Sequence, residues 1–352
     1  MSAISFNGEL VHYEVLGRGR PVLLIHGWIG SWRYWVPTMQ QLQAKYRVYA
    51  LDLYGFGDSG KNPNRYSLEH QIALIDDFMN QLGIPKTAII AHGLGAMLAI
   101  MFARRYPERI PKLMVVSAPL FDTGDLDRRT PAGRKVLLGG GRVSTLEQQQ
   151  EEFSPNAPTA MSASAAMRAA LIEAARARGN GIPIPETALP PPTPDDMTMD
   201  RAKILSSSTS NPLMPILIQG NVQALLGKCF KKTEIFYEKL DVDTPKTDGR
   251  ALIASAASFD AGRMLDTMRL LPMHTAIIHG MDDPIIPAPS DEVWSYISLD
   301  KESSVLPITL PGVRHFPMLE EDRFMGVVND FLETDDLNRI SLRDERWRRR
   351  TR

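Results

Sequence analysis

The sequence predicts an α/β fold: a mostly parallel, doubly wound sheet that carries an inserted helical domain. Short apolar runs alternate with helical stretches over the first 120 residues, and this alternation stops at about residue 124 and resumes near residue 271. Such runs are typical of strands buried on both faces, and strand–helix alternation favours parallel strands covered by helices on both sides. We therefore expect a sheet domain built from residues 1–123 and 271–335, a helical cap or lid over 124–270, and a basic tail over 336–352.

The elements of the sheet domain follow from these runs. Residues 9–16 follow a turn at Asn7-Gly8 and predict a strand, and Pro-Val-Leu-Leu-Ile at 21–25 is continuously apolar. Further strands are expected at 46–53, 86–91, 112–117, 275–279 and 306–310. Helices are expected near 31–44, 67–82, 94–105, 288–297 and 319–333.

The predicted insertion lacks apolar strand runs. Its stretch Ala165–Arg178 spaces Ala, Met, Leu and Ile for one face of a helix. Residues 182–194 are rich in proline and predict loop or polyproline structure, whereas residues 212–230 are again apolar. The insertion therefore reads as helices joined by irregular segments.

Composition excludes several classes of protein. The chain has 352 residues, of which 43% are hydrophobic and 23% charged, and these values exclude disorder as the overall state. A net charge of −1 gives no field that favours nucleic acid or an anionic membrane, so neither is expected as a partner. Because no run of 18 apolar residues occurs, no membrane span is expected, and residues 1–8 do not read as a signal peptide. The single cysteine, Cys229, cannot form an internal disulfide, and we expect a reducing, cytoplasmic location.

Residues 91–96, Ala-His-Gly-Leu-Gly-Ala, join an apolar strand to a strongly apolar helix. This context is that of a nucleophile elbow, whose motif is Gly-x-Ser-x-Gly. Ala91 and Gly95 are small enough for strand and helix to pack tightly around the turn. The nucleophile position, however, is Gly93, which has no side chain that could attack a carbonyl.

An acid and then a histidine follow two later strands. Gly280-Met281-Asp282-Asp283-Pro284 comes after the first of them, and Gly312-Val313-Arg314-His315-Phe316-Pro317 after the second. A lone Asp in this position is usually a helix cap, and a lone His is usually structural. Together with a preceding elbow they give the order nucleophile, acid, base, which favours a catalytic pair.

With these motifs the sequence resembles the α/β-hydrolase superfamily, in the branch with a lid after the sixth strand. The resemblance covers residues 9–123 and 271–335. The residues that carry it are His26-Gly27-Trp28, Asp52-Leu53-Tyr54-Gly55-Phe56-Gly57-Asp58-Ser59, the elbow at 91–95, Gly280 to Pro287, and His315-Phe316-Pro317.

The resemblance implies a role for each matched residue. Asp283 is expected to be the triad acid, with Asp282 the weaker candidate, and His315 the general base. The backbone N–H groups of Trp28 and Leu94 are expected to form the oxyanion hole. The residues Asp52 and Ser59 match positions that are mostly structural. The lid is expected to define a pocket for a small hydrophobic acyl-type substrate or ligand.

Gly93 leaves three explanations open. The chain could be a hydrolase of an ester, lactone or related acyl bond whose nucleophile was replaced, and loss of a catalytic serine costs roughly a million-fold in turnover. It could be a non-catalytic protein that binds a small molecule. It could also use only the Asp283–His315 pair as a general base. Among nearby side chains Cys229, Ser117 and His92 are poor substitute nucleophiles.

No cofactor or metal is expected. Gly139-Gly140-Gly141 has no strand before it and predicts a flexible turn rather than a phosphate-binding loop. No cluster of His and Cys has metal-ligand spacing. From Arg339 onward the tail carries seven arginines against Asp344 and Glu345. We expect it to be solvated or self-docked, or else to contact an acidic partner or phosphates.

Overall fold

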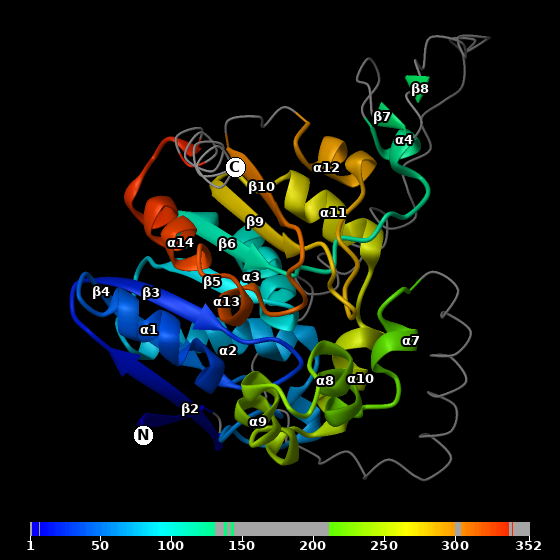
Figure 1. The fold of residues 1–352 in the computed structure, drawn as a ribbon. Helices are drawn as coiled ribbons and strands as arrows, with labels where there is room; N and C mark the ends of the chain where they lie inside the picture. Colours follow the sequence, from blue (N-terminus) through cyan, green and yellow to red (C-terminus); the bar gives the residue numbers. More distant parts are fainter. Residues whose placement is uncertain are drawn as a thin grey trace, which may run out of the picture. The chain divides into compact units, whose positions relative to one another are not determined.

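Strands and helices alternate along the chain as the sequence predicts, and a computed structural model shows how they assemble (Figure 1). The structure describes residues 2–6, 8–130, 137–138, 142–143, 211–299, 304–337 and 340. These residues belong to one compact unit, which comprises residues 1–144 and 204–352.

Eight strands form the main sheet, in the order β1-β2-β4-β3-β5-β6-β9-β10. They are β1 (Ser2–Phe6), β2 (Glu9–Leu16), β3 (Arg20–Ile25), β4 (Tyr46–Leu51), β5 (Ala88–His92), β6 (Lys112–Val116), β9 (His274–Gly280) and β10 (Val305–Leu310). From β4 to β10 all neighbours are parallel, whereas β1 and β2 pair antiparallel at one edge. The predicted fold class, a mostly parallel doubly wound sheet, is confirmed. Two short strands, β7 (Leu137–Leu138) and β8 (Arg142–Val143), pair separately.

The helices are short to medium in length. They are α1 (Val36–Leu42), α2 (Leu68–Gln81), α3 (Leu94–Arg105), α4 (Leu126–Arg129), α7 (Met214–Leu217), α8 (Val222–Cys229), α9 (Ile235–Asp241), α10 (Gly249–Ala257), α11 (Ala261–Arg269), α12 (Asp291–Ile297), α13 (Pro317–Glu320) and α14 (Phe324–Glu333). Single 3-10 turns are η1 (Trp32–Trp35), η2 (Pro63–Arg65), η3 (Pro107–Arg109) and η4 (Thr244–Lys246).

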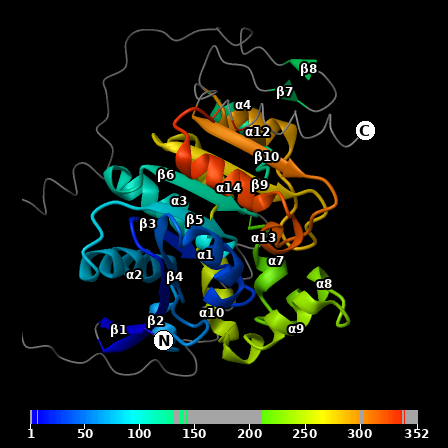
Figure 2. The ribbon, with the colours of Figure 1, turned by 60° about the vertical axis from the view of Figure 1, so that its left-hand side comes forward.

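Helices cover both faces of the main sheet (Figures 1 and 2). Helices α1 and α14 touch each other on one face, and α2, α3, α11 and α12 form a row of contacting neighbours on the other. The strands between them are buried on both sides, which explains why they read as continuous apolar runs. None of the helices in the described part of the chain is long and apolar enough to cross a membrane.

Two elements differ from the sequence-based expectation. Strand β1 is not expected from the sequence, because a five-residue edge strand of alternating burial gives a weak signal. The helix expected at 319–333 is two helices, α13 and α14. Glu321 between them is extended, and its carboxylate accepts hydrogen bonds from the Arg323 backbone and guanidinium, which replaces the helical pattern there.

Residues 211–270, the longest described part of the predicted insertion, are helical, whereas its short strands β7 and β8 are not expected from the sequence. Polar side chains attach the helices to the loops that follow the sheet strands. The contacts are Trp28 Nε1 to Ser255 Oγ, Ser31 Oγ and Arg33 to Asp243, Lys246 to Asp58, Tyr66 to Asp248, and Arg314 to Glu234. The expected helix at 165–178, the proline-rich segment and most of the tail lie outside the described residues. The domain boundaries therefore stay a prediction.

Candidate functional site

The carboxyl ends of the parallel strands bring the motif residues to one edge of the sheet, where ligands bind in folds of this kind. The contributions are His26, Gly27 and Trp28 after β3, Gly93 after β5, Ser117 after β6, Asp283 after β9 and His315 after β10. Residues that lie up to 289 positions apart in the sequence therefore meet in space, since His26 and His315 share this edge.

The turn between β5 and α3 has the backbone of a strained elbow. Gly93 has φ +52° and ψ −111°, its N–H donates to Val116 O at 3.0 Å, and its carbonyl accepts from Met97 N. A Cβ at Gly95 would lie 2.6 Å from His26 O, so strand β3 and helix α3 approach too closely for any side chain there. The sequence predicts both features.

Asp283 and His315 form a buried hydrogen-bonded pair. His315 Nδ1 lies 2.8 Å from Asp283 Oδ2, and both side chains are fully buried. Asp283 Oδ1 accepts the N–H groups of Ile285 and Ile286 at 2.8 and 3.0 Å. Burial alone would raise the pKa of Asp283, but the neighbouring His315 and these hydrogen bonds outweigh it and lower the pKa to about 2. The pair is therefore fixed in geometry, with an ionised acid.

The other ring nitrogen of His315, Nε2, is buried and has no hydrogen-bond partner among the described residues. An ionised Asp283 at Nδ1 places the ring proton on Nδ1, which leaves the lone pair of Nε2 free to accept a proton. Asp282, the alternative acid, is exposed. Its backbone N–H donates a hydrogen bond to Val313 O. The structure thus brings Asp283, and not Asp282, to the histidine.

Two backbone donors lie beside the elbow. Neither the N–H of Trp28 nor that of Leu94 donates a hydrogen bond within the described part of the chain. Leu94 is the first residue of α3, so the positive end of the helix dipole reinforces its donor. The indole of Trp28 is buried and donates to Ser255 Oγ of α10 at 2.9 Å. Such a pair of free N–H groups can stabilise a developing oxyanion.

None of the three substitute nucleophiles is free to react. Ser117 Oγ donates to the carbonyl of His315 at 3.1 Å. Both ring nitrogens of His92 are hydrogen-bonded, Nδ1 to Tyr34 Oη at 3.0 Å and Nε2 to His315 O at 2.8 Å. Cys229 is buried in α8, and burial raises the pKa of its thiol well above the ordinary value.

Tyr34, and the bonds of His92 and Ser117 to the His315 backbone, are site features that the sequence does not predict. Tyr34 belongs to the aromatic group at 28–35, where burial among apolar rings is the ordinary expectation. The one available signal is the hydroxyl itself, because a buried tyrosine usually needs a polar partner.

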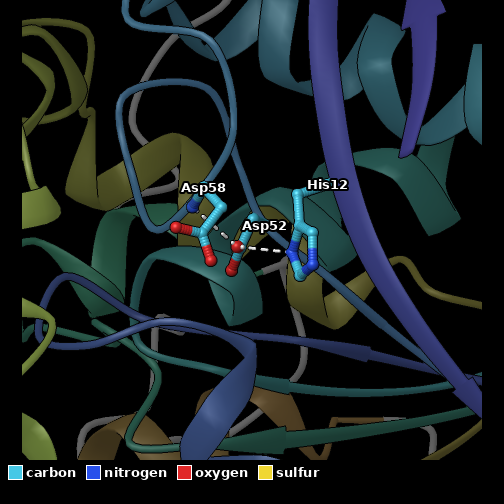
Figure 3. A group of neighbouring side chains, drawn as sticks. All are labelled: His12, Asp52 and Asp58. Carbon is cyan, nitrogen blue, oxygen red and sulfur yellow. Dashed lines mark hydrogen bonds and ion pairs between the residues drawn. The ribbon is translucent and has the colours of Figure 1, made fainter. Parts of the chain in front are cut away.

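A second polar cluster joins β2 to the loop after β4 (Figure 3). His12, Asp52 and Asp58 place potential ligand atoms within 4.8 Å of one another. Asp52 Oδ2 is bonded to His12 Nδ1 and Asp58 N, and the Asp58 carboxylate is paired with Arg33 and Lys246. Burial would lower the pKa of His12, but Asp52 outweighs it and raises the pKa. Because His12 and both carboxylates are already bound to partners within the protein, they suit a structural network rather than a metal site.

Comparison with known proteins agrees with this geometry. The family model for the alpha/beta hydrolase fold matches residues 20–172. Epoxide hydrolase 4 of Mus musculus is 39% identical over 120 residues, which are 33% of this chain and 33% of that protein. Epoxide hydrolase 2 of Siraitia grosvenorii is 34% identical over 146 residues, 39% of this chain and 44% of that protein. The chain thus spans less than half the length of these curated relatives.

Solved structures show the same fold across nearly the whole chain. The thermophilic esterase of Thermogutta terrifontis matches with a TM-score of 0.59 and 16% identity, covering 94% of this chain and 98% of that one. At this identity the likeness establishes the fold alone. Residues 20–172 thus match the model of the α/β-hydrolase family, and the fold of that family extends over nearly the whole chain.

Proposed function

We propose that the protein is a hydrolase for an ester, lactone or related acyl bond, with its nucleophile position occupied by glycine. The observation that carries the proposal is the completeness of the site around Gly93. Three observations support a site that lacks only its attacking side chain: the buried Asp283–His315 hydrogen bond, the positive φ of Gly93, and the free N–H groups of Trp28 and Leu94. In this form the chain lacks covalent serine-hydrolase turnover, because a missing nucleophile costs roughly a million-fold.

The roles follow from the geometry. An oxygen nucleophile at position 93 would give its proton to His315 Nε2, and Asp283 would stabilise the imidazolium that forms. The N–H groups of Trp28 and Leu94 would hold the negative oxygen of the tetrahedral intermediate. In this proposal the chain supplies the lone pair of His315 Nε2, the Asp283 carboxylate and the two N–H donors. It does not supply the nucleophile.

A second candidate function is the opening of epoxides, which the two curated relatives favour by name. That chemistry in this superfamily needs an aspartate at the elbow, so Gly93 removes its nucleophile equally. The elbow substitution therefore separates the two candidates: serine restores acyl chemistry, whereas aspartate restores epoxide chemistry.

The test is a set of three variants assayed in parallel. The original chain, Gly93→Ser and Gly93→Asp are given 4-nitrophenyl esters of increasing acyl length and a chromogenic epoxide, with Gly93→Ala as the control for the added Cβ. We expect ester hydrolysis by Gly93→Ser at least about 1,000-fold above Gly93→Ala. If Gly93→Asp opens the epoxide and no variant hydrolyses the esters, the result would favour the second candidate.

Two results would replace the proposal. Turnover of an ester by the original chain, abolished by His315→Ala, would show that the Asp283–His315 pair activates water as a general base. If all variants fold and none turns over either substrate while small acyl compounds still bind, the protein is a non-catalytic binder.

A further inference from the structure

We infer that His92 and Ser117 are positioning residues that hold the backbone of His315 in register with the elbow. The inference rests on the proposed function, since it assigns residues that set the base of that same site. Both side chains donate to one atom, the carbonyl oxygen of His315, from His92 Nε2 at 2.8 Å and from Ser117 Oγ at 3.1 Å. All three residues are fully buried.

The two donors come from the centre of the sheet. His92 ends β5 and Ser117 directly follows β6, two strands at the centre of the sheet, and Gly93 N donates to Val116 O between them. The loop that carries His315 begins after β10, the last strand in the sheet order, two strands away from β6. Its carbonyl is thus tied to the same two strand ends that build the elbow, which fixes the distance between base and nucleophile position.

The bonding partners determine the protonation of His92. The N–H of Gly27 donates to Tyr34 Oη at 2.7 Å, so the Tyr34 hydroxyl is free to donate to His92 Nδ1 at 3.0 Å. His92 Nε2 must then carry the proton, since its partner is the carbonyl of His315, which can only accept. All four groups are satisfied by a neutral ring with its proton on Nε2.

This chain of bonds also reaches the oxyanion loop. Gly27 precedes Trp28, whose N–H is one of the two free donors at the elbow. Tyr34 and His92 therefore connect the backbone of the expected oxyanion hole to the backbone of the base, through side chains that are at most 5% exposed. A change at His92 should disturb both ends.

Ser117 has a strained backbone conformation. Its φ of +47° is the only positive value at a non-glycine residue in the described part of the chain. Glycine would relieve that strain but would lose the hydroxyl that reaches His315. Strained non-glycine residues of this kind persist where the surrounding structure needs them, and they gather at functional sites.

The charges around His92 agree with a neutral ring. The titratable groups that face it are Tyr34, His315, Asp283 and His26. Burial and the nearby His315 lower the pKa of His92 well below its ordinary value. The rings of His92 and His315 lie 4.6 Å apart between centroids, so a charged His92 would oppose the imidazolium that His315 must form during catalysis.

The first arm of the test needs no activity. The original chain, labelled with ¹⁵N-histidine, is examined by long-range ¹H–¹⁵N NMR between pH 5 and pH 9, with His92→Gln used for assignment. We expect His92 to show one protonated nitrogen, Nε2, and one unprotonated nitrogen, Nδ1, throughout this range. Titration of His92 within the range, or a proton on Nδ1, would overturn the inference.

The second arm measures the consequence in the Gly93→Ser background, as the rate constant for fluorophosphonate labelling and as kcat and KM for an ester. His92→Phe keeps a ring but loses both hydrogen bonds, and we expect kcat to fall by about 100-fold with KM changed less than about threefold. His92→Gln retains a donor and an acceptor and should recover most of that loss. Ser117→Ala should fall by about 10-fold.

Tyrosine variants keep the test independent of folding defects. Tyr34→Phe retains its ring and removes the bond to His92, so it should lower kcat. Tyr296→Phe, which loses a bond from α12 to Asp266 of α11, should not. Equal rates for His92→Phe and the Gly93→Ser parent would overturn the inference. If the parent itself stays unlabelled, the proposed function fails while the NMR arm still decides the protonation of His92.

Discussion

Gly93 has a positive φ, a backbone conformation that favours glycine. A residue with a nucleophilic side chain at this position would have to adopt the same strained φ. A side chain at φ +52° costs on the order of 1–3 kcal/mol, and the loss of glycine's freedom in the unfolded chain offsets about 0.5–1 kcal/mol. A Cβ there would also lie 3.2 Å from Trp28 Cε3, so the indole, held by Ser255, must shift by a few tenths of an ångström.

We therefore expect Gly93→Ser to lower the free energy of unfolding by about 1 kcal/mol, measured by urea titration. The matched control is Gly93→Ala, which adds the same Cβ and should cost a similar amount. A clear gain in stability for either variant would contradict the strained elbow.

The buried carboxylate of Asp283 predicts a pH dependence. Its pKa is lowered to about 2 in the folded chain, against an ordinary value near 3.8. A depressed pKa contributes stability above the unfolded value, and that contribution is lost as pH falls from about 4 towards 2. The amount is on the order of 2 kcal/mol.

Urea titrations between pH 2 and pH 5 measure this effect. The free energy of unfolding of the original chain should rise with pH over this window, and Asp283→Asn should flatten that rise. Asp282→Asn, at the exposed neighbour, should leave the slope as it was. Equal slopes for the original chain and Asp283→Asn would show that Asp283 is not held as the structure describes.

Sequence reasoning succeeds for residues whose place is set by local spacing. The spacing from Gly280 that the family resemblance supplies favours Asp283 over Asp282, and Asp283 is the one that lies beside His315. It fails for Tyr34, His92 and Ser117, because their partners lie 7, 58, 198 and 223 positions away and their bonds depend on which strands become neighbours. The nucleophile-elbow motif places His92 next to the nucleophile position, but it does not predict which groups His92 contacts.

At the scale of elements, the helices of the predicted insertion depend on a few buried polar contacts with the sheet domain. Asp243, which is 1% exposed, accepts Ser31 Oγ at 2.5 Å and the guanidinium of Arg33 at 2.9 Å. Removing the carboxylate leaves the buried Ser31 hydroxyl without its acceptor, while Arg33 keeps its bond to Asp58. An unmade buried bond of this kind costs about 1–3 kcal/mol.

We expect Asp243→Ala to lower the free energy of unfolding by about 2–3 kcal/mol. Glu238→Ala on the exposed side of α9 is the matched control and should change it by less than about 0.5 kcal/mol. If both variants unfold at the same urea concentration as the original chain, this contact does not hold the helices in place.

Elements with a strong pattern are predicted well, and those set by tertiary contacts are not. The apolar runs of β3, β5 and β6 predict these strands to within two residues, since burial on both faces keeps all but their end positions apolar. The expected helix at 319–333 breaks because the Glu321 carboxylate bonds Arg323 instead of continuing the helical pattern. This break involves only neighbouring residues, but the spacing of apolar residues does not predict it.

At the scale of the whole molecule, the order of parallel strands gathers the site. Strands β3, β5, β6, β9 and β10 each end at one edge and each contributes a residue there. The order nucleophile, acid, base along the chain predicts this arrangement, because parallel strands place their carboxyl ends together. What the fold leaves unfilled is the single side chain at position 93.

The most direct measurement is fluorophosphonate labelling followed by mass spectrometry of the intact and digested protein. The original chain should gain no adduct, whereas Gly93→Ser should gain one adduct, located at position 93, at a rate that His315→Ala reduces by about 1,000-fold or more. A correctly folded Gly93→Ser chain that stays unlabelled, or an original chain that is labelled at another residue, would contradict the claim that only the nucleophile is missing.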